Sequence, residues 1–97
     1  MAIKLKVKLI GVFRGLSGRD QLHIDFEKPV SIETMIKKIV ELFSHSFKQT
    51  LIDPVSNDPR PNTIILVNGK EISVLNGIET EVNDGDEIVL IPVSHGG

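Results

Sequence analysis

The stretch NDGDEIVLIP, residues 83–92, decides the fold of this chain. Its first four residues are turn formers, and the apolar run at 88–91 is typical of a strand that avoids water on both faces. The proline at position 92 has no amide hydrogen to give to a sheet, so it either ends this strand or lies on its edge. The strands that pair with this run must come from earlier in the chain.

The clearest earlier strand is IKLKVKL, residues 3–9, in which apolar side chains alternate with lysines. This period of two predicts a strand with one buried face. Two glycines interrupt the pattern within residues 14–20, and the alternation resumes over residues 21–27. We therefore predict that residues 3–26 form two antiparallel strands joined by a turn.

The middle of the chain predicts one amphipathic helix, over residues 32–45. Ser31 is suited to cap its amino end, where Glu33 complements the helix dipole. Residues 44–62 are rich in Pro, Asn and Asp, and we expect an irregular connection that either holds a short helical turn or is mobile. The apolar positions at helical spacing are Ile32, Met35, Ile36, Ile39, Val40 and Phe43.

A further strand pair is predicted after this connection. TIILV at 63–67 is a β-branched run, Asn68-Gly69 is a strong hairpin signal, and residues 70–72 return as a short strand. The order strand, strand, helix, strand, short strand, strand is the layout of an α+β fold of the β-grasp, or ubiquitin-like, type. We expect a mixed sheet of four to five strands with one main helix packed on one face. If the first and last strands are both central in it, they are parallel neighbours.

The two late strands carry a further indication, because residues 64–67 and 88–91 are apolar at every position. One helix covers only one face of the sheet, so two interpretations are open. Either part of the other face is an exposed apolar patch of the kind that marks a partner site, or the connection at 44–62 folds over it.

The composition limits the class of protein. At 97 residues the chain has room for one domain, which we expect to span residues 1–93 and to be followed by a flexible tail at 94–97. The absence of cysteine excludes disulfides, thiolate metal sites and cysteine nucleophiles. No apolar run is long enough to span a membrane, and no signal peptide is recognisable, so we expect a cytoplasmic protein.

The charge is divided unevenly along the chain. Residues 1–50 carry nine Lys or Arg against five Asp or Glu, whereas residues 51–97 carry two against eight. The net charge of −2 and the lack of a basic run argue against direct nucleic-acid binding. The two halves either form oppositely charged regions of one surface, or the acidic half docks on a basic partner.

No conventional active site is visible. His23, His45 and His95 lack the spacing of metal ligands, and Asp84 and Asp86 are interpreted as turn residues, so no metal or bound cofactor is predicted. The remaining chemical feature is the end of the sequence, Ser94-His95-Gly96-Gly97. A glycine α-carboxylate is unhindered and ionised at neutral pH, so it is able to attack the α-phosphate of ATP, and a diglycine is narrow enough to enter a partner's channel.

The sequence resembles the ubiquitin-like sulfur carriers, a family that includes the MoaD, ThiS and ubiquitin-related modifier types and the small archaeal modifier proteins. Residues 64–69 look like the strand and turn of this family, and residues 83–93 resemble the MoaD-type ending. The final Ser94-His95-Gly96-Gly97, and Arg60-Pro61 before the third strand, are more similar to the ubiquitin-related modifiers.

The resemblance implies a protein that is a co-substrate and not itself an enzyme. An activating enzyme similar to those that charge ubiquitin would use ATP to adenylate Gly97, while Gly96 and His95 lie in its channel. A sulfurtransferase would then supply the sulfur of a thiocarboxylate.

The destination of the sulfur stays open at this point. It would go to molybdopterin, with this chain as the small subunit beside the large subunit of molybdopterin synthase, to a thiamine precursor, or to tRNA thiolation. The alternatives are a modifier conjugated to lysines through Gly97, and a β-grasp interaction domain whose diglycine is incidental.

Overall fold

The computed structural model describes residues 1–93 of the chain. Five strands form one mixed sheet in the order β2-β1-β7-β4-β5, and β3 and β6 pair separately as a two-stranded sheet. The strands are β1 (Ile3–Leu9), β2 (Gln21–Phe26), β3 (Val30–Ser31), β4 (Thr63–Val67), β5 (Lys70–Glu71), β6 (Glu81–Val82) and β7 (Glu87–Pro92). The helices are α1 (Val12–Ser17), α2 (Ile32–Leu42) and α3 (His45–Leu51), with 3-10 turns η1 (Ile72–Val74) and η2 (Gly77–Glu79).

The first and last strands are parallel neighbours at the centre of the sheet, as the sequence predicts. Val7 is paired with Ile88 and Leu9 with Leu90, whereas β2 and β4 run antiparallel to these two strands. Alternation along β1 places the four apolar side chains of residues 3–9 in the core and its lysines on the opposite face. Pro92 is the last residue of β7, in keeping with its missing amide hydrogen.

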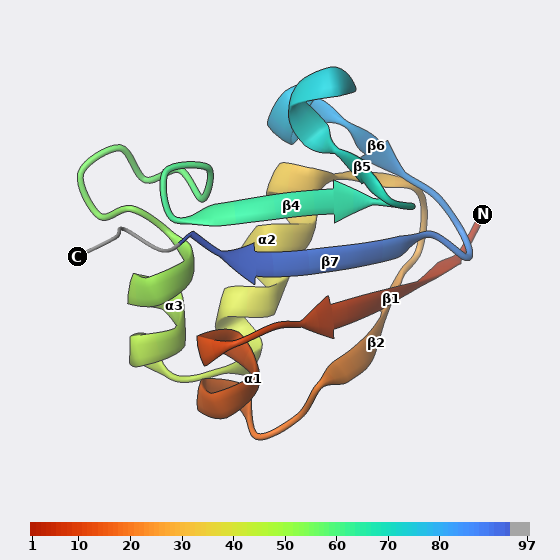
Figure 1. Cartoon of the computed structure of the whole chain (residues 1–97). Coiled ribbons are helices and arrows are strands. Elements are labelled where there is room, and N and C mark those ends of the chain that lie inside the picture. The colour runs from red at the N-terminus through yellow and green to blue at the C-terminus, as the bar shows by residue number, and fades with distance from the viewer. Residues whose placement is uncertain (94–97) are drawn as a thin grey trace.

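The helices lie on one side of the sheet, and we call the opposite side the outer face. Figure 1 shows α2 behind the central strands β7 and β4, with no helix in front of them. The amphipathic stripe of α2 buries Met35, Ile36 and Ile39 against the strands, and Ser31 caps the helix by accepting a hydrogen bond from the amide of Thr34. The predicted β-grasp arrangement of a mixed sheet with a main helix on one face is confirmed.

The predicted turn between the first two strands is wrong in detail, because it contains the six-residue helix α1. Gly18 ends the helix in the left-handed conformation, and Phe13 is completely buried. Its ring lies 5.4 Å from that of Phe47 on α3. A helix this short is unstable alone, so a contact with a distant segment stabilises it, and local sequence carries little sign of that contact.

The helix predicted for residues 32–45 is also wrong at its carboxyl end. It stops at Leu42, Phe43 is extended, and Ser44 starts α3 by accepting a hydrogen bond from the amide of Phe47. The connection expected to be irregular over 44–62 therefore begins with a helix of seven residues. The break is accompanied by burial, because Phe47 and Leu51 of α3 are both completely buried in the core.

The two tight turns have the predicted positions. Asn68 and Gly69 connect β4 to β5 with positive φ angles, and β5 ends at Glu71, one residue earlier than predicted. Around the turn at 83–86, the Asp84 carboxylate accepts a hydrogen bond from the backbone amide of Lys4, and the Asp86 carboxylate accepts one from the backbone amide of Asn83. These carboxylates hold the backbone, which confirms their interpretation as turn residues.

Candidate functional site

The structure fixes the point from which residues 94–97 depart, and we call residues 92–93 the tail base. On one side, Pro92 lies against Gly11, where an added Cβ would stand 3.1 Å from the proline Cγ. On the other side, the amide of Val93 donates a 2.9 Å hydrogen bond to the carbonyl oxygen of Asn62. In Figure 1 this end of β7 lies beside α3 and the start of β4, at the end of the sheet opposite the amino terminus.

The predicted reactive residue Gly97 and the predicted channel residues Gly96 and His95 lie outside the described residues. Their roles therefore stay predictions. What the structure adds is the anchoring of the chain just before them. Sequence reasoning missed the anchors Gly11 and Asn62, because the contacts that define them join segments far apart in the chain.

An apolar patch covers the outer face next to the tail base. We define it as Ile10 together with the outward-facing side chains of β4 and β7, namely Ile64, Leu66, Val89 and Ile91. Strand pairing places Ile64 opposite Ile91 and Leu66 opposite Val89. Ile64 is 38% exposed and Ile10 is 42% exposed, whereas the other three are half-buried. Together they form a continuous surface suited to docking another protein.

The connection at 52–62 does not cover this patch. Ile52, Asn57 and Pro59 line a cavity together with α2, so they lie on the helical side of the sheet. Of the two interpretations left open by the sequence, the structure therefore favours an exposed apolar patch. The continuous apolar run in the two strands was the signal that pointed to it, and Ile10 extends the same surface from the end of β1.

The connection is ordered by its own charges and hydrogen bonds. Arg60 donates to Asp58 through Nη2 at 2.6 Å and Nε at 2.9 Å, and these bonds lower the pKa of the Asp58 carboxyl and raise the pKa of the Arg60 guanidinium. The Asp53 carboxylate accepts hydrogen bonds from the backbone amide and the hydroxyl of Ser56, and these bonds lower the pKa of the Asp53 carboxyl. This loop carries Asn62, and so it supports the tail base.

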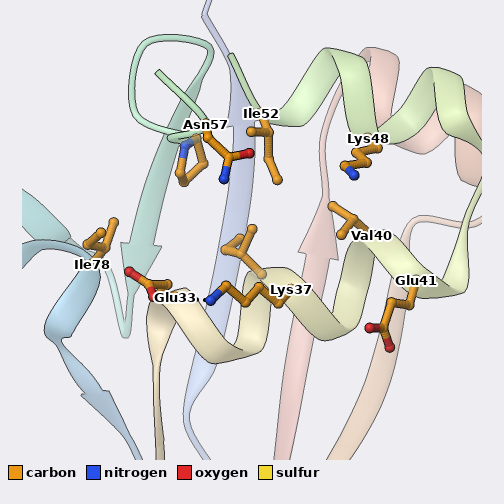
Figure 2. A pocket seen from close by; sticks show the side chains of 10 residues that line it. Glu33, Lys37, Val40, Glu41, Lys48, Ile52, Asn57 and Ile78 are labelled. Atoms are coloured by element: carbon orange, nitrogen blue, oxygen red, sulfur yellow. Dashed lines mark hydrogen bonds and ion pairs between the residues drawn. The ribbon is translucent and has the colours of Figure 1, made fainter. Parts of the chain in front are cut away.

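The helical side has the cavity shown in Figure 2, with a volume of about 430 Å³. Lys48 from α3 and Val40 from α2 lie near one end of it, and Ile78 lies near the other. At its rim the Lys37 ammonium pairs with the Glu33 carboxylate at 3.3 Å, one turn apart on α2. With both charges on its rim, the cavity has no pronounced preference for an anion or a cation.

Two kinds of site are not found in the described part of the chain. Within residues 1–93, no group of three or more His, Asp or Glu side chains is arranged to hold a metal ion. His23 lies on the outer face of β2 opposite Lys6, and His45 is the first residue of α3. Among the helices of these 93 residues, none is long and apolar enough to cross a membrane.

The sheet order, the helix behind it, the apolar outer face and the anchored tail base together define a ubiquitin-like protein of the β-grasp fold. Comparison with known proteins agrees. Residues 4–97 match the model of the Urm1 family, described as ubiquitin related modifier. A protein of Archaeoglobus fulgidus named as a sulfur carrier is 30% identical over 76 residues, which cover 78% of this chain and 83% of that protein.

Solved structures show the same architecture. The small archaeal modifier protein 1 from Methanosarcina acetivorans has a TM-score of 0.78 at 25% identity, with 100% of this chain and 99% of that chain covered. Urm1 from Trypanosoma brucei has a TM-score of 0.79 at 23% identity, with 99% of this chain and 97% of that chain covered. This chain belongs to the Urm1 family, and its relatives are small ubiquitin-like carriers and modifiers.

Proposed function

We propose that this protein is a sulfur carrier activated at the α-carboxylate of Gly97. In the first step a carboxylate oxygen attacks the α-phosphate of ATP, pyrophosphate leaves, and an acyl-adenylate forms on the carrier. A persulfide of a sulfurtransferase then attacks the acyl carbon and displaces AMP. A second thiol then attacks the sulfurtransferase sulfur of this acyl disulfide, a disulfide forms between the two thiols, and the thiocarboxylate leaves as the sulfur donor.

The observation that carries this proposal is the family match, which extends through the diglycine to residue 97. The tail base supports it, because β7 ends at Pro92 and the last backbone hydrogen bond described is made by Val93. Four further residues reach at most about 14 Å when extended, which is enough to enter an active site in a partner. The reactive group would thus lie no farther from the end of the sheet than this reach allows.

The apolar patch gives the activating enzyme a surface to bind. Val89 and Ile91 of the patch lie on β7, the strand that leads into the tail, so docking there would place Gly97 toward the enzyme. The enzyme would supply the ATP site, and this chain would supply the carboxylate and the docking surface. Partners on this proposal are an adenylating enzyme and a sulfurtransferase.

The likeness to each type of relative supports a different destination of the activated carboxylate. The Urm1 match favours tRNA thiolation, and the MoaD-like ending at residues 83–93 favours delivery to a molybdopterin precursor through the large subunit of molybdopterin synthase. The second candidate function, conjugation to lysines, is favoured by the likeness to a small archaeal modifier protein. All three routes begin with the same adenylation of Gly97.

The test is the intact mass of the protein after incubation with the activating enzyme of the same organism, ATP and a sulfur source. We expect an oxygen-to-sulfur exchange that fragmentation places on Gly97. The matched control lacks Gly97 and should show no exchange, with an unchanged free energy of unfolding. An unchanged mass of the full chain, with an enzyme that charges another carrier, would contradict the proposal.

A further inference from the structure

The apolar patch has a positive charge along only one of its sides. We call this side the basic margin and define it as Lys6, Lys8, Arg14 and Arg19. Strand pairing places Lys8 beside Val89 of the patch, and Lys6 precedes it on the same face of β1. The two arginines continue the margin beyond the end of β1, on α1 and the loop that follows it.

Arg14 lies next to the apolar patch. It lines a cleft of about 390 Å³ together with Lys8 and Ile10, so the positive charge borders an apolar side chain directly. A second cleft adjoins the first, and it is lined by Arg14 and Arg19 with glycines of the same segment. The basic margin therefore follows the rim of the patch to Gly11, which contacts the tail base.

Within residues 1–93, the guanidinium groups of Arg14 and Arg19 form no ion pair. Both are exposed, and no carboxylate within residues 1–93 lies within 4.0 Å of either guanidinium, although Asp20 lines the same clefts. Lys6 and Lys8 share Glu87, at 4.0 and 3.6 Å. One carboxylate for two ammonium groups leaves a net positive charge on that side as well.

The other side of the patch is different. Strand β5 borders it there with one residue of each charge, Lys70 and Glu71, and Glu71 accepts a hydrogen bond from Ser73. Most acidic side chains of the second half of the chain are likewise engaged, such as Asp58 with Arg60 and Asp86 with Asn68. The acidic half is therefore less suited to dock on a basic partner than its composition indicates.

We propose that the protein which binds the apolar patch carries carboxylates along the side that faces the basic margin. This inference rests on the proposed function and specifies the chemistry of the partner: an apolar projection with acidic side chains on one flank. Apolar contact alone does not fix which way round two surfaces meet, whereas charge on one flank does. Pairing with Arg14 and Arg19 would turn the tail base toward the partner's active site.

The test compares two double charge reversals that change the net charge of the protein equally. Arg14→Glu with Arg19→Glu reverses the margin, and Lys37→Glu with Lys38→Glu reverses two lysines on α2, which is on the helical side of the sheet. The probe is the activating enzyme of the same organism, with association rate and Kd measured at low and at high salt. Far-UV circular dichroism and thermal unfolding establish that both variants are folded.

We expect the margin reversal to slow association by about tenfold at low salt and to lose most of its salt dependence, because electrostatic steering is lost. The α2 reversal should stay within about twofold of the wild type. If the first variant is unstable, Arg14→Gln with Arg19→Gln removes the charge without adding repulsion, and a smaller effect of the same sign is expected.

Equal effects of the two reversals would overturn the inference while leaving the proposed function intact. Wild-type protein that binds the enzyme but is not charged at Gly97 would contradict the proposed function, and the binding measurements would still decide the role of the margin. Wild-type protein that does not bind the enzyme at all would contradict both.

Discussion

Gly11 lies directly against Pro92, so that a residue two positions beyond the end of β1 contacts the last residue of β7 and fixes where the tail begins. A Cβ added to Gly11 would stand 3.1 Å from Cγ of Pro92, which is closer than ordinary van der Waals contact. The φ angle of Gly11 is +57°, a conformation that residues with a side chain rarely adopt. Both features require glycine at this position.

Gly11→Ala should therefore destabilise the protein more than Gly18→Ala. Gly18 also has a positive φ, of +74°, but an added Cβ would meet nothing within 4 Å. Strain alone at Gly18 should cost about 1–2 kcal/mol of unfolding free energy, measured by urea denaturation. In a double-mutant cycle, Pro92→Ala should relieve part of the cost of Gly11→Ala, and strict additivity of the two changes would argue against the contact.

Substitutions at two adjacent residues of β4 should have different effects, one on stability and the other on docking to the activating enzyme. Ile65 is 1% exposed in the core, so Ile65→Ala should lower the unfolding free energy by about 2–5 kcal/mol. Ile64→Ala, on the apolar patch, should change stability by about 0.5 kcal/mol. The exposed variant should nevertheless raise the KM of the activating enzyme for the carrier. A normal KM for Ile64→Ala would argue against docking at the patch.

The pair Phe13 and Phe47 should couple α1 to α3. Both rings are completely buried and lie 5.4 Å apart, so Phe47→Ala should cost about 3–5 kcal/mol. Because α1 depends on this contact, hydrogen exchange should accelerate in residues 12–17 as well as in α3. Leu51→Ala, another core change within α3, serves as the control. Equal protection of α1 in the two variants would show that the ring pair is not its specific support.

The Asp58–Arg60 pair predicts a pH dependence of stability. The folded-state pKa of Asp58 is lowered chiefly by its hydrogen bond from Arg60. The pair therefore contributes fully above the unfolded carboxyl pKa of about 3.9, and its contribution is lost as the pH falls through the lower folded value. Asp58→Asn should be less stable than the wild type at pH 7, and the difference in unfolding free energy should vanish once the pH falls below the folded-state pKa of Asp58. A difference that persists in acid would refute this assignment.

Much of the fold could be predicted because strong local patterns agreed with the tertiary structure. The alternation in residues 3–9, the β-branched run before Asn68-Gly69 and the turn at 83–86 all became the elements they predicted. The amino end of α2 was equally clear, because Ser31 is a good N-cap. The site was less accessible to prediction, since the sequence indicated an apolar patch but not the anchors or the margin around it.

The sequence by itself determined the order of the main strands and the main helix along the chain and the apolar character of the late strands, because periodicity and turn residues act locally. It also supplied the diglycine on which the proposed chemistry depends. Only the tertiary structure decided that α1 exists, that α2 stops at Leu42, and that Arg14 lies beside Ile10. The physical reason is that these features depend on contacts between distant segments, whose energies exceed the weak preferences of short stretches of chain.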